Sequence, residues 1–391
     1  MKNLQEFTQN PKRKLGINCR LIMTEWKTYK LGDIAKFQTG KLNSNAAIEN
    51  GKYPFFTCSP NTLAIDNYAF DKDAILLAGN NAEGNFSIKY YKGKFNAYQR
   101  TYIIETFNDV CDIKFLFYAL KICLQRFKLM SQGTSTKFLT AVILNNFEIS
   151  LPSLEEQRRI AGILGAIDDK IENNRRINTN LELQAQALFD EWFITNTSRL
   201  GAFSKAYLTD IANYLNGLAM QRFRPLEGEI GIPVLKIKEL GQGQYDSSSD
   251  LCSPSIEEKY IVRDGDIIFS WSGTLLVDIW CGGVCGLNQH LFKVTSDKYP
   301  QWFIYYWTKH HLAKFIRIAK DKAVTMGHIK RGDLEVSEVL IPDEKSFAEM
   351  DEMMSPIFKA IVANRFANRQ LATLRDTLLP KLMNGEIKVT E

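Results

Sequence analysis

The sequence predicts an α+β fold, in which two similar globular domains are joined by two long antiparallel coiled-coil helices as a pseudo-two-fold internal repeat. Two observations predict it. KFLTAVILNNFEISLP, which begins at Lys137, is echoed by GHIKRGDLEVSEVLIP at Gly327, and the separation of these two positions defines the offset of the repeat. Two seams of apolar residues at alternating steps of four and three, the 3.5-residue period of a coiled coil, follow these segments at the same offset. A repeat at a fixed offset indicates one structural plan used twice.

The composition is that of an ordinary globular protein. The 391 residues are 45% apolar and 24% charged, enough for about two to three domains of roughly 150 residues. The net charge of +5 permits an acidic polymer as partner without requiring one. No apolar run reaches ~18 residues and the N-terminus lacks a signal-peptide core, so we expect a cytoplasmic protein with no membrane partner.

The cysteines also favour a cytoplasmic protein. Seven cysteines, an odd number without regular spacing, argue against a disulfide framework. Cys281 and Cys285 form the one close pair, and no histidine or second cysteine pair stands at zinc-site spacing around them. We therefore expect buried thiols in a reducing compartment and no metal site.

The repeats divide the chain into five segments. LGDIAKFQTG at Leu31 is echoed by LTDIANYLNG at Leu208, at a shorter offset, so loop lengths differ between the halves. Better-patterned sequence begins at Met23, which leaves residues 1–22 as an N-terminal extension. The interpretation is a first globular domain at 23–152, a central helix at 153–197, a second domain at 198–342 and a C-terminal helix at 343–391.

Both helices carry start signals. Ser153 follows a proline and is followed three residues later by Glu156, a capping box, and Asp343 stands at the equivalent N-cap position of the second helix. Pro356 falls early in the second helix. It predicts a kink or a short break there, because proline lacks the N–H that an inner helical residue donates.

Each apolar seam is interrupted by two asparagines at matched steps, Asn174 and Asn178 in the first helix and Asn364 and Asn368 in the second. The ends of a compact domain usually lie close together, so the second helix should run back antiparallel along the first. Asn174 then faces Asn368, and Asn178 faces Asn364. A buried amide pair weakens a seam, but any other register leaves amides against leucine or isoleucine, so the asparagines fix the register.

Positive charge gathers in stretches that recur in both halves. Lysines and one arginine alternate with aromatic residues between Ser87 and Arg100, and further basic runs span residues 121–137 and 309–331. Basic side chains attract phosphate, and Asn, Gln and Arg reach base edges. A single such run is usually a solvated helix face, but its repetition favours nucleic-acid binding. GNNAEGN at Gly79 and SWSGT at Ser270 follow strand-like runs, where loop tips would project.

Catalytic signatures are missing from the sequence. Gly79 and Gly84 have the spacing of a phosphate-binding loop, but Asn85 stands where its lysine belongs. There is no cluster with metal-ligand spacing and no G-x-S-x-G, and all four histidines lie in the second half. The absence of these patterns favours a protein with two similar binding domains over an enzyme.

From Met23 onward the chain resembles the specificity subunit of type I restriction–modification systems. The strongest likeness is in LPSLEEQRRIAGILGAIDDKIENNRRINTNLELQAQALFDEWF at Leu151 and LRDTLLPKLMNGEI at Leu374. Further similar segments are TEWKTYKLGDIAKFQTGK at Thr24, QGTSTKFLT at Gln132 and VTMGHIKRGDLEVSEVLIP at Val324.

The resemblance implies two target-recognition domains that each read one half of a split, asymmetric site on double-stranded DNA. It implies that the helices set the spacer and dock two methyltransferase subunits, which in turn recruit the restriction (translocase) subunits. S-adenosylmethionine, ATP and Mg²⁺ would belong to those partners, with no cofactor and no catalytic residue in this chain. Two alternatives remain open: a DNA-modifying enzyme with an unrecognised site, and a two-headed adaptor that binds protein.

We expect each domain to lay a loop into the major groove, with basic residues on flanking phosphates. The candidates in the first domain are Asn80, Asn81, Asn85, Lys89, Lys92, Gln99, Arg100, Ser135, Thr136 and Lys137. Those in the second domain are Trp271, Ser272, Asn288, Gln289, His290, Lys322, Thr325, Met326 and His328. Candidate partner contacts on the exposed helix faces are Arg158, Arg159, Arg175 and Arg176.

Overall fold

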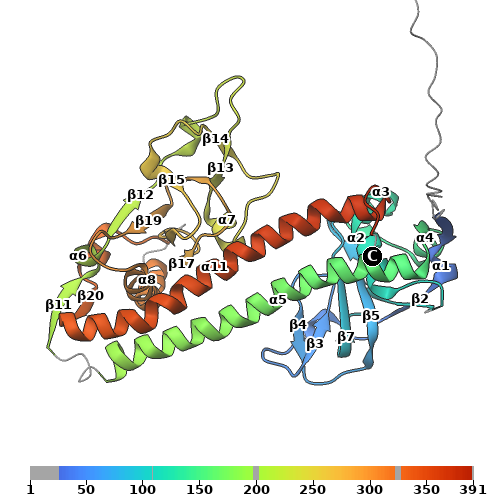
Figure 1. The fold of residues 1–391 in the computed structure, drawn as a ribbon, viewed down its shortest axis with the longest axis horizontal. Coiled ribbons are helices and arrows are strands. Elements are labelled where there is room, and N and C mark those ends of the chain that lie inside the picture. The colour runs from blue at the N-terminus through green and yellow to red at the C-terminus, as the bar shows by residue number, and fades with distance from the viewer. Residues whose placement is uncertain (1–25, 108, 197–201, 322–326, 390–391) are drawn as a thin grey trace, which may run out of the picture. The chain divides into compact units, whose positions relative to one another are not determined.

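The computed structural model describes residues 26–107, 109–196, 202–321 and 327–389, so the expected extension at residues 1–22 lies outside them. The chain forms two compact units. The first is Met1–Ile163 with Leu379–Glu391, and the second is Leu164–Leu378. The boundaries fall inside two long helices, α5 (Leu154–Asp190) and α11 (Glu344–Met383). Each unit combines sheets and helices (Figure 1), which confirms the α+β class.

The first unit is built on a six-stranded sheet of order β2-β8-β5-β7-β3-β4, antiparallel except for the β3–β7 pair. Helix α2 packs on β5 and β7, and its N-cap Asp112 accepts a hydrogen bond from the amide of Phe115. The strands are β1 (Lys27–Lys30), β2 (Ala35–Thr39), β3 (Tyr53–Phe56), β4 (Leu63–Ile65), β5 (Phe70–Ala78), β6 (Asn80–Asn81), β7 (Ile88–Ala97), β8 (Thr101–Thr106), β9 (Lys137–Phe138) and β10 (Glu148–Leu151). The short helices are α1 (Leu31–Ile34), a 3₁₀ turn (Ser44–Ala46), α2 (Ile113–Ile122), α3 (Leu124–Met130) and α4 (Ala141–Asn145).

The second unit repeats this topology in two sheets, β12-β19-β16-β17 and β14-β13-β18-β15. Its strands are β11 (Phe203–Tyr207), β12 (Asn213–Asn216), β13 (Ile232–Leu235), β14 (Leu251–Cys252), β15 (Ile261–Val262), β16 (Ile267–Ser270), β17 (Leu276–Ile279), β18 (Cys285–Leu287), β19 (Leu291–Thr295) and β20 (Glu338–Pro342). Its helices are α6 (Leu208–Ile211), α7 (Ile237–Gln242), α8 (Gln301–His310), α9 (Leu312–Asp321) and α10 (Arg331–Glu335), with 3₁₀ turns at Met220–Arg222 and Glu258–Tyr260 and a π-helical turn at Glu191–Thr195.

The two sheet arrangements differ in their central strands. The single strand β7 of the first unit corresponds to β17 and β18 together, since the offset of the repeat carries its first residue into β17 and its last residue to the end of β18. Gly282 and Gly283 stand in the gap between β17 and β18, and Gly283 has a φ of 101°. Few other residues adopt this backbone conformation, so the strand breaks here. The equivalent of β5 is likewise divided, into β15 and β16, and one six-stranded sheet becomes two smaller ones.

Each globular domain is closed by a pairing of its first and last strands. β1 pairs antiparallel with β10, placing Lys27 opposite Leu151, and β11 pairs with β20, placing Phe203 opposite Pro342. In the second unit this brings the chain that leaves α5 next to the chain that enters α11. The expectation that domain ends lie together, from which the antiparallel course of the helices was inferred, is therefore met.

The helix starts agree with the sequence signals. The amide of Glu156 donates to Ser153 Oγ at 3.3 Å, and the amide of Ser346 donates to Asp343 Oδ1 at 2.9 Å. Of the kink or short break expected at Pro356, the break is wrong, because α11 is continuous from Glu344 to Met383. Pro356 lies on an exposed face of the helix. The carbonyl oxygen four residues before Pro356 has no amide to accept from, and on this exposed face it can be hydrated. Buried neighbours such as Met354 and Phe358 hold the helix on its other side.

Within the second unit, α5 and α11 lie side by side and antiparallel (Figure 1). Asn174 Nδ2 donates to Asn368 Oδ1 at 2.9 Å, and Asn364 Nδ2 donates to Asn178 Oδ1 at 2.9 Å. Asn178 Nδ2 also donates to the backbone oxygen of Ile361 at 3.0 Å. Asn174 is 1% and Asn178 6% exposed. The pairing that the register predicts is thus confirmed, and the amides of these pairs hydrogen-bond to each other within the seam.

Candidate nucleic-acid interface

Three segments of the first unit that sequence analysis singled out meet at one point. The amide of Gly79, just after β5, donates to the backbone oxygen of Arg100 at 2.8 Å. The backbone oxygen of Gly79 accepts from the amide of Leu139 at 2.9 Å. β6 and β9 then pair, with Asn81 opposite Lys137. We call the meeting point of these segments the junction of the unit.

The second unit has the same junction. The amide of Trp271, just after β16, donates to the backbone oxygen of His290 at 3.3 Å, and the backbone oxygen of Trp271 accepts from the amide of Ile329 at 3.1 Å. His290 and Ile329 are the residues to which the offset of the repeat carries Arg100 and Leu139. A bridge between Ser272 and His328 takes the place of the β6–β9 pair. Different side chains are therefore presented on one shared backbone frame.

The junction of the first unit gathers amides and cations. Asn81 Oδ1 accepts from the amides of Glu83 and Asn85 at 2.9 and 3.0 Å, which holds the loop in a fixed turn. Lys128 Nζ donates to Asn85 Oδ1 at 2.8 Å, and the Arg100 guanidinium lies 5.4 Å from the centre of the Phe138 ring. Arg100 and Asn85 are exposed. Such a set can meet both phosphate and base edges.

Other candidates of the first unit are placed differently. Lys89 and Lys92 are three residues apart on β7 and so point to opposite faces of the sheet. Lys89 is half-buried, its Nζ donates to the Ser59 backbone oxygen at 3.0 Å, and burial lowers the pKa of its amine. Gln99 Nε2 donates to Asn43 Oδ1 at 2.9 Å. Ser135 is exposed and Thr136 half-buried in the loop before β9.

The junction of the second unit is aromatic. The Trp271 ring lies 5.7 Å from the Phe292 ring in a stacked arrangement and 5.8 and 6.4 Å from the rings of His290 and His328. Trp271 Nε1 donates to Asn216 Oδ1 at 2.9 Å. Accessible amide, imidazole and indole groups offer both stacking surfaces and hydrogen-bonding edges to a nucleic acid.

The remaining candidates of the second unit differ in access. Gln289 Nε2 lies 3.5 Å from His290 Nε2, and both side chains are partly exposed. Ser272 is 4% and Asn288 8% exposed, so both are largely shielded from a ligand, and Asn288 Oδ1 accepts from the amide of Gln289 within its own turn. Three candidates, Lys322, Thr325 and Met326, lie outside the described residues.

Each junction holds a buried polar atom that has no hydrogen-bond partner among the described residues, Asn80 Oδ1 in the first unit and His290 Nδ1 in the second. Such atoms are rare in folded proteins, because leaving them unpaired costs stability. Water or a bound molecule can satisfy them.

Sequence reasoning missed two members of the junctions, Lys128 and Asn216. Lys128 belongs to the basic run at residues 121–137, and Asn216 lies in the repeat LTDIANYLNG, so both stood in segments already marked. What the sequence lacked was the tertiary contact that selects these two residues from their neighbours.

Of the four helix arginines proposed as partner contacts, Arg158, Arg175 and Arg176 are exposed, whereas Arg159 is half-buried with a buried Nε. In the first unit Arg158 is exposed and Arg159 pairs with Glu155 at 3.6 Å. In the second unit Arg175 and Arg176 pair with Glu172 at 3.9 and 3.3 Å. The exposed ion pairs of Arg175 and Arg176 contribute little to stability, so these two side chains remain available to a partner.

In the described part of the chain, no group of three or more His, Cys, Asp or Glu is arranged to hold a metal ion. Cys281 and Cys285, the close pair of the sequence, are buried thiols. Burial raises the pKa of the Cys281 thiol to about 11 and that of the Cys285 thiol to about 12. Thiols at such pKa values stay protonated near neutral pH and are poor nucleophiles and metal ligands. None of the described helices is both long and apolar enough to cross a membrane.

Comparison with known proteins gives a consistent picture. A family model described as type I restriction modification DNA specificity domain matches residues 23–183. Over 151 residues the chain is 40% identical to the EcoDI specificity subunit of Escherichia coli, a match that covers 39% of this chain and 33% of that protein. It is 27% identical over 417 residues to the MjaIX specificity subunit of Methanocaldococcus jannaschii, covering 95% of each. The fold is similar to the crystal structure of a type I restriction–modification S subunit from M. genitalium, with 17% identity, a TM-score of 0.63 and coverage of 96% of this chain and 99% of that one.

Proposed function

Because this chain belongs to the family of type I restriction–modification specificity subunits, we propose that it recognises the DNA target for a complex of this kind. The observation that carries the proposal is the repeated junction. Two backbone frames joined by equivalent hydrogen bonds present different sets of polar, basic and aromatic side chains. The shared backbone frame suits one mode of DNA binding in both units. The different side chains on it suit two different base sequences.

In this proposal each unit reads one half of a split, asymmetric site. Arg100, which is exposed, and Lys137, which is partly exposed, contact phosphate, and amide or ring groups near them contact base edges. The two unpaired polar atoms of the junctions would find partners in DNA or in bridging water. The antiparallel helices set the spacer, since their register is locked by the asparagine pairs.

The same proposal extends to partners. Two methyltransferase subunits would dock on the exposed faces of the long helices, where Arg158, Arg159, Arg175 and Arg176 lie, and the restriction subunits would join through them. S-adenosylmethionine, ATP and Mg²⁺ would be bound by those partners and not by this chain. We place the complex in the cytoplasm, since its DNA target lies there.

Lys137→Ala is expected to weaken binding of the chain, assembled with its methyltransferase partner, to all duplexes by a similar factor. A phosphate contact carries no sequence information, so the base preference should stay unchanged. The slope of log K against log salt should fall in magnitude by about 0.9, the value for one lost phosphate contact. Fluorescence anisotropy over a salt series measures both quantities.

Lys36→Ala is the matched control, because Lys36 pairs with Glu105 at the end of β8 away from Arg100. The control should leave the slope unchanged. A Lys137→Ala variant with a new base preference would remove Lys137 from the phosphate-contacting set. Binding without salt dependence would favour a protein adaptor instead, and methyl transfer by the purified chain alone would favour an enzyme.

A further inference from the structure

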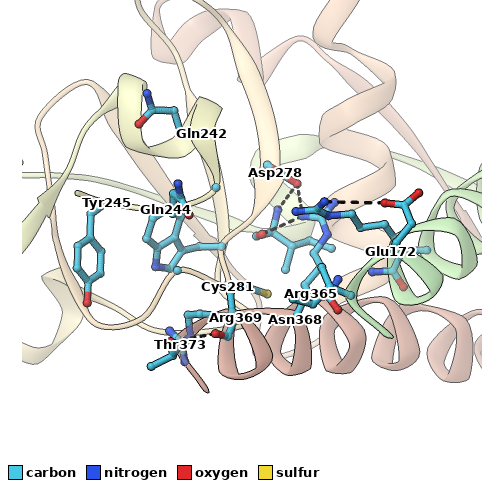
Figure 2. A pocket seen from close by; sticks show the side chains of 18 of the residues that line it. Glu172, Gln242, Gln244, Tyr245, Asp278, Cys281, Arg365, Asn368, Arg369 and Thr373 are labelled. Carbon is cyan, nitrogen blue, oxygen red and sulfur yellow. Dashed lines mark hydrogen bonds and ion pairs between the residues drawn. The ribbon is translucent and has the colours of Figure 1, made fainter. Parts of the chain in front are cut away.

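Two arginines of α11 hold the β16–β17 hairpin of the second unit at the end opposite its turn. The first is Arg365, which joins three elements. Its Nη1 donates to Asp278 Oδ1 at 2.6 Å and to the backbone oxygen of Ile279 at 3.1 Å, both in β17, and its Nη2 donates to Glu182 Oε1 of α5 at 2.9 Å. Figure 2 shows Arg365 reaching from α11 to Asp278.

The second is Arg369, one helical turn further. It binds Asp264 with both ends of its guanidinium, Nη1 to Oδ1 at 3.0 Å and Nη2 to Oδ2 at 2.6 Å. Asp264 Oδ1 also accepts from the amide of Gly283 at 2.9 Å. A Cβ at Gly283 would lie 2.7 Å from Arg369 Nη1, so the positive-φ glycine that breaks the strand also leaves room for this arginine. A two-pronged pair fixes direction as well as distance.

These ion pairs differ from the other contacts that hold the second globular domain to α11. Nearer the start of α11, the domain is held by aromatic packing, with Trp302 stacked on Phe347 at 5.9 Å and Tyr305 against Phe358 at 5.7 Å. Around Arg369 the domain faces the helices across an open groove of 1070 Å³, lined by polar side chains such as Gln242 and Thr373 (Figure 2). Beside this groove, the Arg369–Asp264 pair bridges the domain and α11.

The hairpin links these contacts to the junction. β16 leads from the Asp264 end to Trp271, and β17 returns from the turn to Asp278. At ~3.3 Å per residue, the turn lies on the order of 13 Å from the arginine contacts. A tilt of the hairpin at its held end therefore displaces Trp271 and its neighbours.

We propose that Arg365 and Arg369 are positioning residues that fix the phase of the second half-site relative to the first. The inference rests on the proposed function and adds to it the contacts by which the complex selects one spacer length. Successive base pairs are about 3.4 Å apart, so a small tilt of the hairpin changes which spacer fits. Neither arginine reads a base.

Among the described residues of the first half, α5 carries no equivalent of these two arginine contacts. Arg175, the repeat equivalent of Arg365, pairs with Glu172 of α5. Thr179, the repeat equivalent of Arg369, donates its hydroxyl to the backbone oxygen of Arg175 at 3.1 Å. Loss of the arginine contacts should therefore act through the second half-site.

The test uses the full complex with its methyltransferase partner and a plasmid library in which the native spacer is lengthened or shortened by one base pair. Arg369→Gln and Asp264→Asn remove the two sides of one ion pair. Each should reduce the preference for the native spacer by about tenfold, the size of effect expected for one charge-assisted contact, with the bases of both half-sites unchanged. Arg369→Lys keeps the charge but not the two-pronged geometry, so it should give an intermediate loss.

Arg263→Gln is the control, because Arg263 neighbours Asp264 but pairs with Glu258 on the surface at 2.8 Å. It should keep the wild-type spacer preference. A wild-type preference in folded Arg369→Gln and Arg369→Lys complexes would overturn the inference, and so would a changed base in the second half-site at an unchanged spacer. If the wild-type complex methylates no split motif, the proposed function itself fails, an outcome distinct from the other two.

Discussion

Asn174→Leu is expected to destabilise the second unit by about 1–3 kcal/mol, although leucine is the more hydrophobic residue and the position is 1% exposed. The substitution removes the amide that donates to Asn368 Oδ1 at 2.9 Å and leaves that oxygen in the seam beside an alkyl group. The lost hydrogen bond and the stranded polar group together outweigh the gain from burying leucine. Urea denaturation followed by circular dichroism measures the change in the free energy of unfolding.

The double variant Asn174→Leu/Asn368→Leu should regain most or all of that stability, because replacing both partners leaves no buried amide unpaired. Asn173→Leu is the matched control, since Asn173 precedes Asn174 on the same helix but is exposed. Its effect should stay within about 0.5 kcal/mol. A single variant as stable as the wild type, or a double variant no better than the single, would contradict a register locked by paired amides.

Insertion of four residues into both helices is expected to lengthen the spacer by about two base pairs and to leave both half-sites unchanged. The sites are after Asp169 in α5 and after Ala372 in α11, which face each other in the observed register. These sites leave the pairs of Arg365 and Arg369 intact. Four helical residues add about 6 Å, and base pairs are about 3.4 Å apart.

Insertion into one helix alone is the control. It shifts by one turn the register of the seam beyond the insertion, separates Arg375 from Asp168 and should abolish site-specific methylation, because the two helices keep one register only when both carry the insertion. Sequencing of methylated sites reads out the spacer. A changed half-site with an unchanged spacer would show that the helices do not set the distance.

The sequence predicted the helices and their register because the physical signals there are local and periodic. Capping residues Ser153 and Asp343 mark the starts, the coiled-coil period marks the seam, and two asparagines per helix leave one register that pairs them. Pro356 led to the wrong prediction of a break because the sequence alone does not say which face of the helix is exposed. On the solvated side, a missing hydrogen bond is tolerated.

The candidate sites were predicted only in part. The three segments of each junction could be marked by their repetition, but the side chains that meet there depend on strand pairing and loop course. Lys89 shows the limit, because a one-residue change of position on a strand exchanges its face. The contacts of Arg365 and Arg369 were not foreseen either, since Asp264 and Asp278 lie far from them along the chain.

The most direct measurement is a genome-wide map of methylated adenines in cells with and without this chain, in a host that expresses its methyltransferase partner. We predict that one split, asymmetric motif is methylated in the first map and unmethylated in the second, with all other methylation unchanged. Identical maps, with the partner present in both, would contradict the assignment of this chain as the subunit that selects the DNA site.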